Sequence, residues 1–228
     1  EGATVFITGR RSDVLEQAKK FIGAGAFAIQ ADVTIGDEVA ALVCKVLDAG
    51  RGIDVLVNSA GIMRFSNLEN VDEADWDEQM RVNAYAPWRC AKEVLPGMRE
   101  RKTGSIINIS SISGLRPNPG SGVYCSSKAS LQMMSQVLAL ETAADNIRVN
   151  VLCPGAVEDT ELADPIFGKE NVQAFYPKLA GLHPLGRNGK PRDVGKAALF
   201  LASDDSSWIT GAVIPVDGGR HLVMNAIQ

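Results

Sequence analysis

Short runs of consecutive apolar residues alternate along this chain with longer segments in which apolar residues recur every three or four positions. The short runs lack the strict polar–apolar alternation of a half-exposed strand, which is typical of strands buried on both faces of a sheet. They predict six strands: Ala3–Thr8, Ala26–Gln30, Asp54–Asn58, Ser105–Ile109, Ile147–Leu152 and Ala212–Val216.

The longer segments have the period of amphipathic helices. They predict five helices: Asp13–Ile22, Gly36–Ala49, Ala74–Arg101, Gly122–Ala144 and Arg192–Ser203. Ser12 and Gly23 are the expected N-cap and C-cap of the first helix, and Pro96 should end or kink the third. Alternation of strands and helices predicts an α/β fold, a parallel sheet with helices on both faces, in one domain over residues 1–228.

Residues 156–189 depart from this alternation, since they contain three prolines and no sustained helical period. We expect a long loop here, because loops of that length in compact domains often cover a ligand site as a lid. His183, next to a proline in this segment, is expected to be an ordinary loop residue.

Composition and charge exclude several classes of protein. Hydrophobic residues make up 46% of the chain and charged residues 22%, and no uncharged apolar run is long enough to span a membrane. The 23 Lys and Arg residues are interspersed among 27 Asp and Glu residues, which argues against a nucleic-acid partner. The four cysteines have no close spacing and the two histidines no acidic neighbours, so we expect reduced thiols, a cytoplasmic location and no metal.

One pair of side chains stands out for its chemistry. Tyr124 and Lys128 are four residues apart in a predicted helix, so both project from the same face. Ser111 comes thirteen residues before Tyr124, directly after a predicted strand. Ligands of open α/β sheets bind at the carboxyl ends of the strands, where these three groups are expected to meet. The alternative is a helix pair on the surface without a function.

The order of motifs along nearly the whole chain resembles that of the short-chain dehydrogenase/reductase family. Asn83, Ser111, Tyr124 and Lys128 match the catalytic tetrad of that family. The other matches are Asp32-Val33, Asn58-Ser59-Ala60-Gly61, Pro154-Gly155 and Val216-Asp217-Gly218-Gly219. The resemblance implies a Rossmann-like, doubly wound parallel sheet that binds a nicotinamide dinucleotide.

The resemblance also implies a role for each member of the tetrad. Tyr124 would exchange a proton with the substrate oxygen while the nicotinamide passes hydride to or from the adjacent carbon. Lys128 would hold the nicotinamide ribose and, through its charge, favour the phenolate form of Tyr124. Ser111 would hydrogen-bond the substrate oxygen, and Asn83 would anchor a water on a proton path. By residue type alone, Asn83 is better explained as a cap or a bend in its helix.

Further residues would contact the cofactor. They are Arg10, Arg11, Asp32, Val33, Asn58, Ala60, Gly61, Tyr124, Lys128, Pro154, Gly155 and Thr160. Thr160 is included because Asp159 stands where relatives carry a threonine for the nicotinamide. Asp32 is alternatively a helix cap, and Asn58 and Gly61 are alternatively turn residues.

Two arginines after the first predicted strand bear on the choice of cofactor. An acidic side chain at this strand end binds the ribose 2′-hydroxyl of NAD(H), whereas arginine accommodates the 2′-phosphate of NADP(H). Arg10 and Arg11 follow the strand, and no acidic residue stands between it and Asp13. We expect NADP(H) rather than NAD(H), with Arg10 the first candidate; the alternative is two solvated arginines.

Relatives begin with a strand, a glycine-rich turn and a helix that bind the cofactor pyrophosphate. Glu1-Gly2 resembles the exit from that helix, so this first βα unit is absent from the sequence. Gly23-Ala24-Gly25 follows a helix rather than a strand, the wrong order for a phosphate-binding turn. Without the unit, two strand edges are left unpaired inside the sheet. We expect a fragment of a longer gene product; alternatively, the first strands pack elsewhere or the two edges pair.

The leading interpretation is an NADP(H)-dependent oxidoreductase for a small alcohol or ketone, moderately apolar to suit the side chains of residues 156–189. One alternative is an epimerase or dehydratase on the same fold, and another is a catalytically silent scaffold or binding protein. The predicted helices that carry Trp88 and Met133 are apolar over much of their circumference, which predicts a homodimer or homotetramer.

Overall fold

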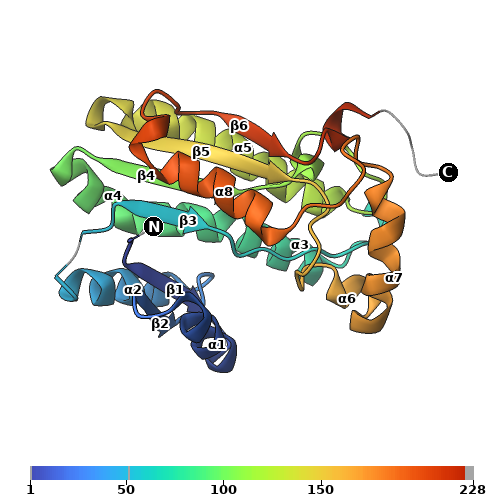
Figure 1. The fold of residues 1–228 in the computed structure, drawn as a ribbon, viewed down its shortest axis with the longest axis horizontal. Coiled ribbons are helices and arrows are strands. Elements are labelled where there is room, and N and C mark those ends of the chain that lie inside the picture. Colours follow the sequence, from blue (N-terminus) through green and yellow to red (C-terminus); the bar gives the residue numbers. More distant parts are fainter. Residues whose placement is uncertain (1, 51, 224–228) are drawn as a thin grey trace.

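The computed structural model describes residues 2–50 and 52–223, and in this part of the chain parallel strands form two sheets (Figure 1). The larger sheet has the order β3 (Val55–Asn58), β4 (Gly104–Ile109), β5 (Ile147–Pro154) and β6 (Val213–Val216). The smaller sheet pairs β1 (Val5–Gly9) with β2 (Ala26–Gln30). All six predicted strands are confirmed, with shifts of one or two residues at their ends, and so is the α/β, Rossmann-like fold class.

The two sheets do not join. Among the described residues, β1 pairs only with β2, and β3 pairs only with β4. The alternative in which the two free edges pair with each other is therefore wrong. Val57 of β3 is 45% exposed, because its strand forms an edge of the sheet.

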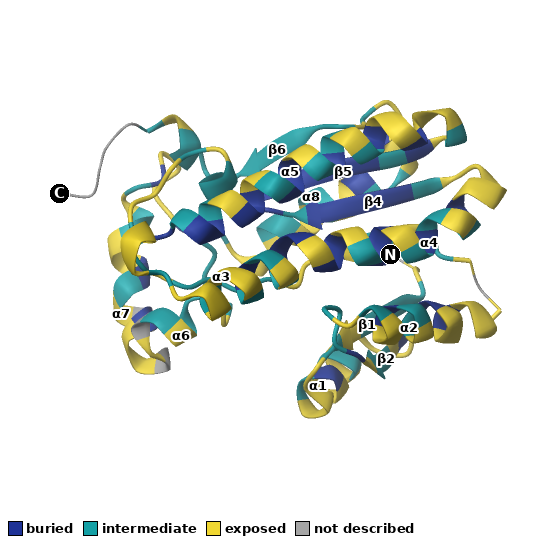
Figure 2. Ribbon diagram, turned by 180° about the vertical axis from the view of Figure 1, so that it is seen from behind, coloured by how far each residue is buried: buried dark blue, intermediate teal, exposed yellow. Residues whose placement is uncertain are grey.

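Helices cover both faces of the four-stranded sheet (Figures 1 and 2). Helix α8 (Pro191–Ala202) packs on one face, and α4 (Ala86–Arg101) and α5 (Gly122–Thr142) pack on the other. Ile106 of β4 lies in the core on the α4 side, and its neighbour Ile107 lies in the core beneath α8. Successive residues of this strand are thus buried on opposite faces, as its uninterrupted apolar run predicts.

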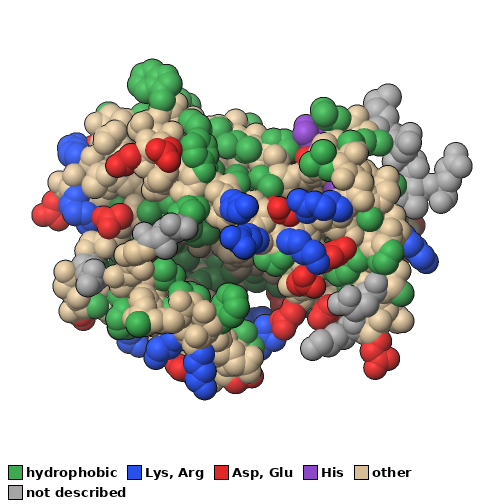
Figure 3. Space-filling view, in the orientation of Figure 1, with side chains coloured by type: hydrophobic (Ala, Val, Ile, Leu, Met, Phe, Trp, Pro, Cys, Tyr) green, Lys and Arg blue, Asp and Glu red, His purple; other side chains and the backbone are tan. Residues whose placement is uncertain are grey.

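Helix α2 (Gly36–Asp48) joins the two-stranded sheet to this body. Its Val43 belongs to the same core cluster as Val94 of α4. Arg89 of α4 also donates from Nη2 to the Gly36 carbonyl at 3.2 Å. Figure 3 shows the surface hollowed between the part that carries β1 and β2 and the rest of the molecule. Helix packing, rather than strand pairing, connects the two parts.

Helix α1 (Ser12–Ile22) differs from expectation at its start. Ser12 is its first helical residue, and the cap position is Arg11, without a side-chain cap, so the predicted N-cap is wrong. Gly23 is the C-cap with φ 101°, a backbone angle that favours glycine, as predicted.

The predicted helix over 74–101 is divided by a π-helical turn. The turn covers Arg81–Tyr85, between α3 (Glu73–Met80) and α4. Pro96 lies inside α4, which continues to Arg101, so of the two predicted effects the end of the helix is wrong and the kink stays a prediction. π turns often occur at functional sites, and this one contains a predicted tetrad residue.

Residues 156–189 contain two helices that the sequence did not predict, α6 (Asp164–Phe167) and α7 (Lys169–Ala180). Gly168 separates them with φ 77°. Val172 and Tyr176 of α7 are buried. The segment is therefore a folded element rather than a long loop. Among all the helices described, none has the length and apolar character needed to cross a membrane.

Candidate active site

Ser111 lies where β4 ends. The amide of Ser110 still donates to the Leu152 carbonyl of β5 at 2.8 Å. Ser111 then caps the 3₁₀ turn Ile112–Gly114, and its Oγ accepts a hydrogen bond from Ser113 N at 3.1 Å. The hydroxyl therefore lies at the carboxyl end of the sheet, as the strand prediction requires.

Tyr124 and Lys128 of α5 meet this serine. The Ser111 side chain lies close to the Tyr124 phenol and lowers its pKa. Lys128 Nζ lies 5.8 Å from the centre of the Tyr124 ring and donates to the Ile109 carbonyl of β4 at 3.0 Å. Tyr124 and Lys128 are each only 4% exposed, so the alternative of a surface pair does not apply. The hydroxyl, the phenol and the amine converge at one place.

Burial governs the ionisation of this pair. It raises the pKa of Tyr124 to about 12, although the hydrogen bond with Ser111 lowers it. It also lowers the pKa of Lys128 to about 8. That the charge of Lys128 favours the phenolate stays a prediction.

Asn83 lies in the π turn and is fully buried. Its Oδ1 accepts from Ile62 N at 2.9 Å, and its Nδ2 donates to the Ile62 carbonyl at 2.9 Å and to Ser127 Oγ at 3.0 Å. The side chain thus ties the turn to the segment after β3 and to the residue before Lys128. Its role in a proton path stays a prediction.

Gly61 lies against the tetrad. A Cβ at this position would lie 3.3 Å from Lys128 Nζ and 3.4 Å from Asn83 Oδ1, so a side chain would crowd both groups. Ala60, its neighbour, is exposed. Asn58 differs: it is buried, and its Nδ2 donates to Asn108 Oδ1 of β4 at 2.8 Å. Because that amide is used within the sheet, a cofactor contact of Asn58 stays a prediction.

Pro154 ends β5, and Gly155 follows it in a tightly packed position. A Cβ on Gly155 would lie 3.0 Å from His183 Nε2. His183 Nε2 accepts from Ala156 N at 3.3 Å, and its Nδ1 lies 2.9 Å from the Leu179 carbonyl. His183 is a loop residue, as predicted, but its side chain is only 3% exposed. His183 connects the end of β5 to α7.

Arg10 and Asp32 follow the carboxyl ends of β1 and β2, with Val33 next to Asp32. Partial burial raises the pKa of Asp32, but hydrogen bonds from Thr34 and the charge of Arg10 bring it below its usual range. Thr34 donates to Asp32 Oδ1 from its amide at 2.9 Å and from its hydroxyl at 2.7 Å. Asp32 therefore forms a turn ahead of α2 but does not cap that helix, whose N-cap is Ile35, so its alternative role as a cap is wrong.

Arg11 makes a contact that the sequence did not indicate. Its Nη2 lies 2.5 Å from Glu161 Oε2 in the segment after β5. The hydrogen bond that Arg11 donates to Glu161 raises the pKa of Arg11, and the negative charge of Glu161 raises it further. This ion pair links the carboxyl end of the two-stranded sheet to the carboxyl end of the four-stranded sheet.

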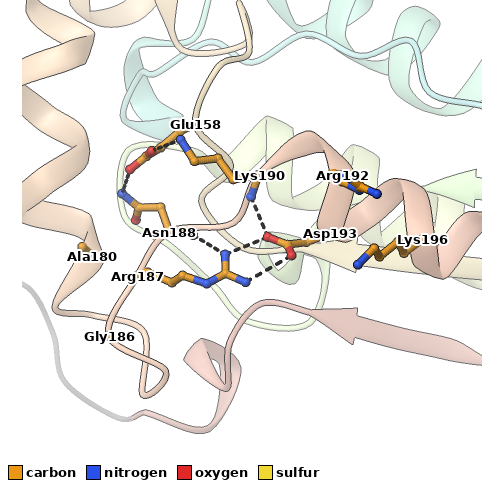
Figure 4. A pocket seen from close by; sticks show the side chains of 9 residues that line it. All are labelled: Glu158, Ala180, Gly186, Arg187, Asn188, Lys190, Arg192, Asp193 and Lys196. Carbon is orange, nitrogen blue, oxygen red and sulfur yellow. Dashed lines mark hydrogen bonds and ion pairs between the residues drawn. The ribbon is translucent and has the colours of Figure 1, made fainter. Parts of the chain in front are cut away.

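Segment 156–189 is tied to α8 by a polar cluster (Figure 4). Lys190 Nζ pairs with Glu158 Oε2 at 2.8 Å, and Asn188 Nδ2 donates to Glu158 Oε1 at 2.8 Å. Arg187 contacts both carboxylate oxygens of Asp193, at 2.7 and 3.1 Å. A cavity of about 380 Å³ lies among these side chains. No tetrad residue lines it, so it is separate from the catalytic groups.

Asp159 and Thr160 lie near this cluster. Asp159 has φ 58°, and its Oδ2 lies 3.1 Å from Lys190 Nζ. The Thr160 hydroxyl donates to the Val157 carbonyl at 3.2 Å. That hydroxyl is thus engaged locally, and its contact with a nicotinamide stays a prediction.

The described residues fit a nicotinamide dinucleotide in part. Tyr124 and Lys128, with Gly61 packed closely against the amine, suit the nicotinamide and its ribose, and Arg10 with Asp32 suits the adenosine end. The part of the chain that is described contains no glycine-rich turn from a strand into a helix for the pyrophosphate. It also holds no group of three His, Cys, Asp or Glu side chains that suits a metal ion.

Gln132 also belongs to this site, although no sequence motif includes it. This residue lies eight positions after Tyr124 and so on the same face of α5, where it is 7% exposed. A polar side chain on the buried face of the helix that carries Tyr124 was the available signal.

A family model described as enoyl-(acyl carrier protein) reductase matches residues 1–221. The 3-oxoacyl-[acyl-carrier-protein] reductase FabG of Thermotoga maritima is 39% identical over 222 residues, which cover 96% of this chain and 88% of that protein. A protein of Xanthobacter autotrophicus named inactive 2-(S)-hydroxypropyl-CoM dehydrogenase 2 is 34% identical over 222 residues, covering 97% of this chain and 96% of that protein.

Among solved structures, ElxO with NADP bound superposes with a TM-score of 0.88 and 30% sequence identity. The match covers 96% of this chain and 89% of the ElxO chain.

Proposed function

Because this chain belongs to the short-chain dehydrogenase/reductase family, whose members act on CH–OH and C=O groups, we propose that it interconverts an alcohol and a ketone with NADP(H). Tyr124 is the proposed proton donor and acceptor. The observation that carries the proposal is the convergence of Ser111, Tyr124 and Lys128 at the carboxyl end of β4.

Ser111 and Tyr124 act on the substrate oxygen in this proposal. The Ser111 hydroxyl hydrogen-bonds the oxygen on which negative charge develops, and Tyr124 gives it a proton during reduction or takes one during oxidation. The nicotinamide, when bound, supplies or accepts the hydride. Since burial raises the pKa of Tyr124, the phenol is protonated at neutral pH, which supports the reductive direction.

Lys128 and Asn83 act beside the reacting atoms. Lys128 Nζ, next to Gly61, holds the nicotinamide ribose. Asn83 keeps the π turn fixed to Ser127 and anchors the water that returns protons from solvent. Lys128 and Ser111 thus orient the reactants, while Tyr124 exchanges the proton.

NADP(H) is proposed over NAD(H) on charge. Arg10 and Arg11 follow β1, and a guanidinium group matches a 2′-phosphate well. The NADP-bound relative ElxO supports the same choice.

Replacing Tyr124 with Phe tests the function. The variant removes only the hydroxyl, so we expect it to keep its fold and to lose turnover by about a thousandfold or more. Tyr85, which is 38% exposed, offers a matched control, and Tyr85→Phe should keep full turnover. Both variants are assayed with NADPH and a panel of moderately apolar ketones. Unchanged turnover in Tyr124→Phe would rule out the proposed proton transfer.

A second candidate function is a catalytically silent scaffold or binding protein. The relative named inactive 2-(S)-hydroxypropyl-CoM dehydrogenase 2 favours it. Binding of NADPH separates the two, since an oxidoreductase must bind the cofactor and a silent protein need not. Failure to bind NADPH at millimolar concentration would favour the silent protein.

Assembly, location and the lid belong to the same proposal. Met133 and Leu140 of α5 are 61% and 82% exposed, and Trp88 of α4 is 45% exposed, which supports a homodimer or homotetramer. Sedimentation as a monomer would contradict this.

The four free cysteines support a reducing location such as the cytoplasm. Within the single domain of residues 1–228, segment 156–189 is the proposed lid over the substrate.

A further inference from the structure

Gln132 reaches from α5 to the ends of two strands. Its Nε2 lies 3.0 Å from Ser110 Oγ, 3.1 Å from the Ser111 carbonyl and 3.3 Å from Cys153 Sγ. Ser110 and Ser111 follow β4, and Cys153 belongs to β5. One amide thus contacts the backbone of the predicted catalytic serine and the neighbouring strand together.

The turn after Ser111 is packed directly on this amide. A Cβ on Gly114 would lie 2.4 Å from Gln132 Nε2 and 2.8 Å from the Lys128 backbone carbon. Position 114 therefore has to be glycine for the turn to approach the helix so closely. This contact packs the 3₁₀ turn after Ser111 against α5, the helix that carries Tyr124.

The partners of Gln132 do not depend on it for hydrogen bonding. Ser110 Oγ donates to the Lys128 carbonyl at 3.0 Å, and the Ser111 carbonyl also accepts from Gly114 N at 3.0 Å. Burial raises the pKa of the Cys153 thiol to about 11, so the sulfur is a neutral, weak acceptor. Removing the amide therefore leaves these groups satisfied but less restrained.

We propose that Gln132 is a positioning residue, which fixes the backbone of Ser111 so that the serine hydroxyl is aimed at the Tyr124 phenol. The position of Ser111 then depends on a side chain two helical turns beyond the tyrosine. This inference rests on the proposed function, since it assigns Gln132 to the alignment of two groups that act on the substrate oxygen.

The test replaces Gln132 with Met, an apolar side chain of similar length. We expect kcat to fall by about tenfold to a hundredfold with KM changed less than about threefold, because misalignment affects the chemical step. We also expect the midpoint of the pH profile of alcohol oxidation to move to higher pH. The hydrogen bond with Ser111 lowers the pKa of Tyr124, so a weaker bond leaves that pKa higher. Gln136→Met, one turn further along α5, is the matched control and should change neither quantity.

A second readout does not need turnover. In protein labelled with ¹³C at the tyrosine Cζ atoms, the Tyr124 resonance is identified by its loss in Tyr124→Phe. Ser111→Ala removes the serine hydroxyl, so the displacement of the Tyr124 resonance in this variant is the reference value for complete loss of the hydrogen bond. Gln132→Met should displace it in the same direction, and Gln136→Met should not.

The two readouts distinguish failure of the positioning role of Gln132 from failure of the proposed function. If the wild-type protein lacks turnover but Gln132→Met displaces the Tyr124 resonance, the proposed function fails and the positioning role stands. A folded Gln132→Met protein with the wild-type resonance overturns the positioning role. Should Gln132→Met not fold, Gln132→Asn, whose shorter amide cannot reach the Ser111 carbonyl, is measured against the same criterion.

Discussion

Lys128 Nζ lies 5.8 Å from the centre of the Tyr124 ring, and the burial that the two groups share favours the uncharged form of each. The pair is therefore costly to the folded state while Lys128 is protonated. This relationship gives a stability prediction that is independent of turnover.

Lys128→Met should stabilise the protein at neutral pH. Burial lowers the pKa of Lys128 from 10.5 to about 8, so the unfolded chain binds more protons between these values and stability rises with pH there. Below pH 8 the burial of protonated Lys128 lowers the free energy of unfolding by its full amount, roughly 3 kcal/mol by the size of the pKa shift. Urea unfolding of both proteins from pH 7 to 10.5 measures it. The advantage of the variant should shrink as pH rises, and a constant difference would contradict the prediction.

Asn108 joins β3 to α5 through two buried hydrogen bonds. Its Oδ1 accepts from Asn58 Nδ2 at 2.8 Å, and its Nδ2 donates to Ser135 Oγ at 2.8 Å. Asn108→Leu should cost about 1–3 kcal/mol of unfolding free energy, because it leaves a buried amide poorly paired. Exposed Asn70 provides the comparison, and Asn70→Ala should stay within about 0.5 kcal/mol of the wild type.

His183 should make the protein sensitive to mild acid. Burial lowers its pKa, so the unfolded chain takes up a proton before the folded protein does. The stability contribution of neutral His183 is present above the unfolded pKa of about 6.5 and is lost as pH falls through the lower folded value. Thermal unfolding of wild type and His183→Gln between pH 8 and 4.5 checks this. Parallel curves for the two proteins would show that His183 is not the titrating group.

Glu161 should affect cofactor preference through its ion pair with Arg11. If Arg11 helps to bind the 2′-phosphate, Glu161→Gln frees it, and NADPH should bind about two- to fivefold more tightly, the size of an exposed ion pair. The affinity for NADH should not change. Calorimetric titration with both nucleotides measures the difference, and equal gains for NADPH and NADH would exclude a phosphate-specific effect. Glu170→Gln, in the same segment, is the control.

Local periodicity was enough to place much of this site. The spacing of Tyr124 and Lys128 determines that they share a helix face, and the apolar run before Ser111 determines that it ends a strand. The six strands were likewise visible in the sequence, whereas the tetrad and its order came from the resemblance to the short-chain dehydrogenase/reductase family. By contrast, the π turn that carries Asn83 and the helices within 156–189 were not, because packing against other elements overrides weak local signals there.

What the sequence determined by itself was the type and direction of each element, hence which side chains leave a strand end or a helix face together. Tertiary structure decided what surrounds those side chains. Burial, not the neighbouring charge, sets the ionisation of Tyr124 and Lys128; Arg11 pairs with a residue 150 positions away; and Gln132 reaches the backbone of Ser111. The reason is physical: backbone period acts over a few residues, whereas desolvation and hydrogen-bond partners come from segments that only folding brings together.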